Sequence, residues 1–158
     1  MSEFPATGDP MPDTALEGAD GSQIRASDFL GRKLVMFFYP KDDTPGCTTE
    51  NIDFSAMAAD FAKADTALLG VSKDPPAKHA RFAAKHHLVA PLASDAIENG
   101  LADALGVWTM KSLYGRKFLG MERSTFLVGR DGRIARVWRK VKVKGHAAEV
   151  LEAARALP

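Results

Sequence analysis

Four short apolar runs divide the chain, and the first is bounded by Gly31 and Pro40. They cover 33–39, 67–71, 125–128 and 133–143. The first contains five consecutive apolar residues, Leu34–Phe38, which is typical of a strand buried on both faces of a sheet. The last two runs are joined through Asp131-Gly132, a dipeptide that favours a hairpin. The pattern therefore predicts four strands, the last of which places Lys140, Lys142 and Lys144 on one face.

Apolar residues recur with helical spacing between and after these runs. Residues 45–64 place Phe54, Met57 and Phe61 on one face, and similar patterns cover 76–87, 97–105 and 146–157. A small hairpin around 18–21 and one helical turn capped by Ser27 precede the first apolar run. Residues 1–13 read as an irregular lead-in. Strands that alternate with helices predict one α/β domain over 1–158, with a central mixed sheet flanked by helices and an N-terminal β-hairpin.

Composition narrows the classes of function. The 158 residues include 21 Lys+Arg and 20 Asp+Glu, a formal charge of +1. This balance gives no overall attraction to nucleic acid or to an anionic membrane, and neither is expected as a partner. No apolar run approaches the ~20 residues that cross a bilayer. The N-terminus lacks a basic start followed by an apolar stretch, so we expect a cytoplasmic protein.

The chain contains one cysteine, Cys47. Thr44 is a good N-cap residue, and Pro45 suits the first position of a helix. Cys47 then falls in the first turn, among unpaired backbone N–H groups at the positive end of the helix dipole. This position favours a thiolate over a thiol. Gly46 leaves room beside the sulfur for a small substrate.

The direction of the Cys47 side chain leaves two interpretations open. Cys47 lies seven residues before Phe54 and fourteen before Phe61, so it shares their apolar helix face. Its sulfur is therefore expected to point toward the sheet. This suits a nucleophile in a dry pocket, and it suits an inert core cysteine equally well.

A resemblance to a known family separates these interpretations. Pro40, Thr44 and Cys47 match the P-x-x-x-T-x-x-C pattern of the peroxiredoxins, and residues 38–48 resemble the peroxiredoxin Q, or bacterioferritin comigratory protein, branch. The likeness covers roughly residues 8 to 155. Further matching positions are Gly106-Val107-Trp108, Lys111, Tyr114, Gly115 and Arg123–Val128.

The resemblance implies a thioredoxin-like fold and a thiol-dependent peroxidase, with no cofactor and no metal. Cys47 would attack hydrogen peroxide or an organic hydroperoxide and become a sulfenic acid. Arg123 would stabilise the thiolate and the charge that develops along the O–O bond. Thr44 would hydrogen-bond the sulfur and the peroxide, and Pro40 would shield the sulfur from water. Backbone N–H groups near Gly46 and Cys47 would hold the peroxide oxygens.

The chain departs from many members of this branch because it has no second, resolving cysteine. The two positions that carry one elsewhere are Ile52 and the helical segment 82–84. The chain thus resembles a one-cysteine enzyme that is resolved by an external thiol: thioredoxin, glutaredoxin with glutathione, or a small thiol. A monomer or weak homodimer is expected. The alternatives are a peroxide sensor and a non-catalytic thioredoxin-fold interaction module.

Two further groups of residues, the histidines and the C-terminal lysines, have side chains that could bind a metal or a partner. The chain has four histidines, at positions 79, 86, 87 and 146, and their spacing does not match a metal site. We expect all four on the surface. The lysines predicted on the face of the 133–143 strand offer a docking surface for an acidic reductase partner.

Overall fold

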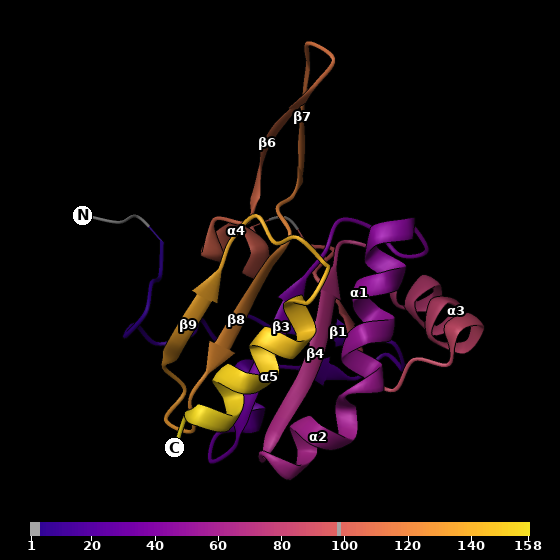
Figure 1. The fold of residues 1–158 in the computed structure, drawn as a ribbon. Coiled ribbons are helices and arrows are strands. Elements are labelled where there is room, and N and C mark those ends of the chain that lie inside the picture. Colours follow the sequence, from indigo (N-terminus) through magenta and orange to yellow (C-terminus); the bar gives the residue numbers. More distant parts are fainter. Residues whose placement is uncertain (1–3, 98) are drawn as a thin grey trace.

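A seven-stranded mixed sheet forms the centre of the computed structural model, which describes residues 4–97 and 99–158 (Figure 1). Its strand order is β2-β1-β5-β4-β3-β8-β9. The middle strands β3, β4 and β5 are mutually parallel, and β1 and β8 join them in antiparallel fashion. The strands are β1 (Leu16–Gly18), β2 (Gln23–Ile24), β3 (Lys33–Phe38), β4 (Thr66–Ser72), β5 (Leu92–Ser94), β8 (Ser124–Val128) and β9 (Ile134–Trp138).

Helices cover both faces of this sheet. They are the 3-10 turn η1 (Ala26–Phe29) and α1 (Pro45–Ala56), α2 (Ala58–Lys63), α3 (Pro76–His86), α4 (Leu101–Leu105) and α5 (His146–Ala156). The strand β3 is buried along its whole length because its side chains alternate between two cores. Met36 and its neighbours of the same parity pack with residues of α4, whereas Phe37 packs with α1, α3 and α5. The thioredoxin-like α/β architecture and the N-terminal hairpin predicted from the sequence are confirmed.

Several predicted boundaries change in the folded chain. The strand predicted over 133–143 ends at Trp138, because Lys140 has a left-handed backbone (φ 49°). Lys140, Lys142 and Lys144 are exposed, but they lie in a loop and not on a strand face. The helix predicted over 45–64 is broken at Met57 into α1 and α2.

The ends of three other segments also differ. The turn predicted to be capped by Ser27 begins instead after Arg25, whose N–H donates to the Asp28 carboxylate. The helix predicted over 97–105 is limited to α4, and residue 98 lies outside the described residues. Residues 1–3 of the predicted lead-in also lie outside the described residues. The later part of the lead-in runs beside β9, where Gly8 N–H donates to the Ile134 carbonyl.

The strands β6 (Trp108–Leu113) and β7 (Arg116–Met121) form a separate hairpin that the apolar pattern did not predict. It projects away from the sheet and helices (Figure 1). Tyr114 and Gly115 turn the chain with positive φ at both positions, as a tight two-residue hairpin requires. The strand β5 was also missed, since three residues are too short for a recognisable pattern.

Candidate active site

Cys47 lies in the first turn of α1, next to the carboxyl end of β3. Pro45 is the first residue of α1 and Thr44 is its N-cap, so Cys47 is the third helical residue. The first turn is closed by Thr48 N–H, which donates to the Thr44 carbonyl over 2.8 Å. Only 1% of Cys47 is exposed, and it packs in the same core as Phe54. The helix start and the inward direction agree with the sequence pattern.

Arg123 approaches the sulfur from the segment between β7 and β8. Its Nη2 donates to Cys47 Sγ over 3.3 Å. A Cβ atom at position 46 would lie 3.3 Å from this nitrogen, so glycine at this position leaves the guanidinium room to approach. Burial opposes the charge of Arg123, but Glu50 and Cys47 together raise the pKa of Arg123 above its usual range. The structure thus brings together the cysteine and the arginine that were predicted to act together.

Glu50 completes this group, and it was not identified from the sequence. Arg123 Nη1 donates to Glu50 Oε1 over 2.7 Å, while Glu50 Oε2 has no hydrogen-bond partner among the described residues. Burial raises the pKa of Glu50 to about 7, although Arg123 opposes the shift. Residues three apart share a helix face, so an acid three positions after Cys47 on an inward face was a usable signal.

The pKa of Glu50 predicts how stability depends on pH. The folded chain retains this proton up to about pH 7, whereas the unfolded chain releases it near the ordinary value for glutamate, ~4.3. The folded state therefore binds more protons within this window, and Glu50 reduces stability as the pH rises through it. In Glu50→Gln we expect this loss to disappear. Thermal unfolding of both proteins between pH 4 and pH 8 measures it, and parallel curves for the two proteins would contradict the assignment.

Pro40 and Thr44 lie in the segment that leads from β3 into α1. The Thr44 hydroxyl donates to the Lys41 carbonyl over 2.9 Å, and its side chain makes no capping hydrogen bond to α1. Pro40 is half-buried directly after β3. In this structure Arg123, and not the Thr44 hydroxyl, provides the side-chain hydrogen bond to the sulfur.

A buried polar cluster ties the loop before α1 to α3. His79 Nδ1 lies 2.7 Å from Asp42 Oδ2, and His79 Nε2 lies 3.0 Å from the Ala93 carbonyl oxygen. The Tyr39 hydroxyl donates to Asp42 Oδ1 over 2.6 Å. Both ring nitrogens of His79 thus lie within hydrogen-bond distance of oxygen atoms, one from Asp42 and one from the backbone of β5. This pair anchors the loop that carries Pro40 and Thr44.

The histidines were expected on the surface, and for two of them this is wrong. His79 is fully buried, and His146 is 6% exposed with its Nε2 2.8 Å from Thr125 Oγ1. Burial lowers the pKa of His146 to about 4, so this ring is neutral at pH 7. His86 is half-buried and contacts Asp43, and only His87 is exposed. The surface assignment failed because it ignored helix phase: His79 lies three residues before the core residue Phe82.

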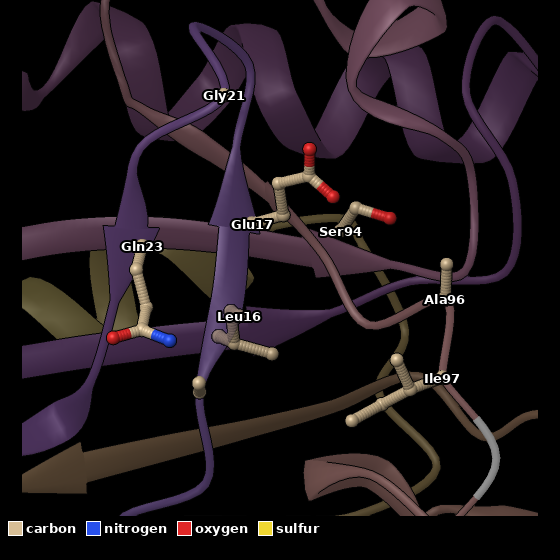
Figure 2. A pocket seen from close by; sticks show the side chains of 8 residues that line it. Leu16, Glu17, Gly21, Gln23, Ser94, Ala96 and Ile97 are labelled. Atoms are coloured by element: carbon tan, nitrogen blue, oxygen red, sulfur yellow. The ribbon is translucent and has the colours of Figure 1, made fainter.

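A cavity of about 320 Å³ opens elsewhere, between β1 and the segment after β5 (Figure 2). It is lined by Ala15, Leu16, Glu17, Gly21, Gln23, Ser94, Ala96 and Ile97. Its walls contain no cysteine, histidine or cationic side chain, so it lacks a group that could attack a peroxide or stabilise an anion. The candidate active site is therefore the group formed by Cys47, Glu50 and Arg123.

A lone cysteine in the first turn of a helix, hydrogen-bonded to an arginine on a thioredoxin-like fold, defines a thiol-based oxidoreductase. Comparison with known proteins makes the assignment specific. The sequence profile of the AhpC/TSA family matches residues 7–137. Peroxiredoxin Bcp of Bacillus subtilis (strain 168) is 46% identical over 145 residues, which cover 92% of each chain.

Solved structures agree with this comparison. The bacterioferritin comigratory protein of Xanthomonas campestris superposes with a TM-score of 0.88 at 43% identity, covering 96% of this chain and 98% of that one. A serine variant of Xylella fastidiosa PrxQ gives a TM-score of 0.91 at 37% identity and covers 98% of both chains. This chain belongs to the AhpC/TSA family, in the branch of the Bcp and PrxQ peroxiredoxins. It is a thiol peroxidase, as the resemblance implied.

Proposed function

We propose that Cys47 is the residue that attacks the peroxide. The observation that carries this proposal is the hydrogen bond from Arg123 to the buried Cys47 sulfur. The thiolate attacks one oxygen of ROOH, so that an S–O bond forms while the O–O bond breaks. The departing oxygen takes a proton and leaves as water or an alcohol, and Cys47 becomes a sulfenic acid. Arg123 stabilises the negative charge that develops on the departing oxygen.

Backbone and side-chain groups around Cys47 would assist its attack on the peroxide. Backbone N–H groups near Gly46 and Cys47 lie in the unpaired first turn of α1, where they can donate to the peroxide oxygens. Pro40 limits the access of water to the sulfur. The Thr44 hydroxyl, which donates to Lys41 in the ligand-free chain, would rotate to hydrogen-bond the peroxide. Glu50 positions Arg123 through the other guanidinium nitrogen.

Both hydrogen peroxide and organic hydroperoxides are proposed as substrates. The Xanthomonas campestris relative has been studied for its alkyl peroxide reduction activity. In this chain Gly46 is exposed at the start of α1 and carries no side chain that would hinder a bulkier peroxide.

An external thiol must complete the cycle, because Cys47 is the only cysteine. The thiol attacks the sulfenic sulfur, forms a mixed disulfide and releases water. A second thiol then attacks the mixed disulfide and restores Cys47. Thioredoxin, glutaredoxin with glutathione, and small thiols are the proposed reductants. Action as a monomer or weak homodimer is part of the proposal.

A cytoplasmic location is part of the proposal, because a catalytic thiol has to be kept reduced. Within residues 4–97 and 99–158, no helix has the length and apolar character needed to cross a bilayer.

Oxidation of the reduced protein by one equivalent of hydrogen peroxide tests the proposal. We expect rapid loss of the thiol and a dimedone adduct on Cys47, detected by mass spectrometry. Addition of thioredoxin or glutathione should then restore the thiol and support repeated turnover. Oxidation no faster than that of free cysteine would contradict the peroxidase role of Cys47. Rapid oxidation without turnover by any of these reductants would favour the sensor.

A further inference from the structure

The β6–β7 hairpin concentrates exposed apolar side chains. Ten large hydrophobic side chains are exposed among the described residues, and half of them lie on this hairpin: Met110, Leu113, Tyr114, Phe118 and Leu119. A two-stranded hairpin has little stability of its own in water, and a cluster of exposed apolar residues is typical of an interaction surface. The hairpin therefore has the composition of a surface that a partner covers.

Charge indicates what kind of partner would fit. The hairpin residues 108–121 include Lys111, Arg116 and Lys117 and no acidic residue. In the adjoining loop 139–144, Arg139 is paired with Glu122, while Lys140, Lys142 and Lys144 add three further cations. This loop is held near the base of the hairpin because Val141 N–H donates to the Arg123 carbonyl. The whole chain carries a formal charge of only +1, so positive charge is concentrated here. An acidic surface is complementary to it.

Strand register divides the hairpin into two sides. Lys111 is paired with Phe118 and Leu113 with Arg116, and paired residues share one side of a two-stranded ribbon. We call these four residues the site-facing side. The register places them on the opposite side from Trp108 and Leu119, which line a cavity with residues between β5 and α4, and Lys111 interacts electrostatically with Arg123 and Cys47. Burial lowers the pKa of Lys111, Arg123 lowers it further, and Cys47 opposes the shift.

The other side of the hairpin faces away from Cys47. It consists of Met110, Ser112, Lys117 and Leu119, which we call the far side. Leu119 lines a cavity of about 450 Å³ together with Ile97 and Asp103, on the side of the hairpin where the segment between β5 and α4 lies. The two sides thus carry similar side chains but differ in their relation to the sulfur.

We propose that the site-facing side of the β6–β7 hairpin is the docking surface for an acidic protein thiol of the thioredoxin or glutaredoxin class. This inference rests on the proposed function, in which an external thiol reduces the Cys47 sulfenic acid. Because Cys47 is only 1% exposed, the partner has to sit directly over the mouth of the site. The six residues of β6 span ~20 Å, enough for the hairpin to contact the flank of a small domain seated there.

The chemistry requires such a partner to be held while two bonds change. The first thiol of the partner forms a disulfide with Cys47 as water leaves, and the second thiol of the partner displaces Cys47 and closes the partner's own disulfide. Two electrons pass from the partner to the protein, and Cys47 returns to a thiol. A small thiol needs no docking surface, because it diffuses to the sulfur without one.

Adjacent residues on opposite sides of the hairpin provide a matched test. Arg116→Glu changes the site-facing side, and Lys117→Glu makes the same charge reversal on the far side. Phe118→Ser and Leu119→Ser form the corresponding apolar pair. In stopped flow, each protein is oxidised with one equivalent of peroxide and then reduced with thioredoxin, with a dithiol glutaredoxin, or with dithiothreitol.

We expect Arg116→Glu to lower the rate at which at least one of the two protein thiols reduces oxidised Cys47, by about tenfold at low salt. The difference in rate from the unchanged protein should shrink as salt increases. Phe118→Ser should lower this rate as well. Lys117→Glu and Leu119→Ser should remain within about twofold of the unchanged protein. Reduction by dithiothreitol and oxidation by peroxide should be the same in all five proteins, which also shows that each variant is folded.

Equal effects of Arg116→Glu and Lys117→Glu, or no effect of either with both protein thiols, would overturn the proposal. It would also be overturned if Arg116→Glu abolished binding to phosphatidylglycerol vesicles while reduction by both protein thiols stayed unchanged, since the hairpin would then contact lipid. If peroxide did not oxidise Cys47 in any of the proteins, the proposed function itself would fail. That result is distinct, because it precedes the reduction step.

Discussion

Cys47→Ser is expected to abolish peroxidase turnover while leaving the fold intact. A serine hydroxyl is not ionised at neutral pH, so it cannot replace the thiolate as a nucleophile. Serine still fits the site, where Arg123 Nη2 can donate to its oxygen as it donates to the sulfur 3.3 Å away. Consumption of hydrogen peroxide with excess dithiothreitol measures the loss, and circular dichroism and thermal unfolding check the fold.

Thr48→Ser is a suitable control for this substitution. Thr48 is the next residue of α1 and is half-buried, and its side chain is not part of the group formed with Arg123. We expect it to keep nearly full turnover. Turnover by Cys47→Ser above the rate in buffer would show that the chemistry does not depend on the cysteine, and it would contradict the proposed mechanism.

Arg123→Ala is expected to have the second largest effect, on both rate and stability. Removing a group that stabilises charge in a transition state typically costs about 10²- to 10³-fold in rate, so oxidation of Cys47 by peroxide should slow by that amount. The same change leaves Glu50, whose side chain is 1% exposed, buried without its ion-pair partner. Where Glu50 is ionised, breaking a buried pair in this way typically costs about 3–5 kcal/mol of folding free energy; the cost is smaller at lower pH, where burial keeps Glu50 protonated.

The double variant Arg123→Ala/Glu50→Gln separates these two effects. Neutral glutamine removes the unpaired charge, so we expect most of the lost stability to return at pH 8 while the rate of oxidation stays low. Arg123→Lys should be intermediate in rate, because a lysine cannot reach Cys47 and Glu50 with two separate nitrogens. An unchanged peroxide rate in Arg123→Lys would refute the role assigned to the guanidinium.

The local start of the active-site helix could be predicted from the sequence. Thr44 and Pro45 have short-range preferences for the first positions of a helix, and the 3.6-residue period then places Cys47 on the same face as Phe54. The buried strand β3 was equally predictable, because Leu34–Phe38 lie between two cores and none of them is polar. These features depend on neighbours close in the chain.

The hairpin and the end of β9 could not be predicted in this way. Residues 109–120 mix apolar and cationic residues on both sides, since the core reaches only Trp108 and Met121 at the base of the hairpin and imposes no alternation beyond them. The strand β9 ends because Lys140 takes a left-handed backbone, although the alternation of lysine and valine continues to Lys144. A period of two describes side-chain polarity, but hydrogen bonding to a neighbouring strand is what maintains a strand.

The sequence by itself determined the helix start and the inward-facing cysteine, because these follow from local preferences, and the single cysteine is the basis of the proposed dependence on an external thiol. Only the tertiary structure decided what surrounds the sulfur. Arg123 meets Cys47 and Glu50 across 76 and 73 residues of chain. His79 similarly meets Asp42 across 37 residues. Such contacts depend on how β3, β8, α1 and α3 pack, and packing is a property of the folded chain as a whole.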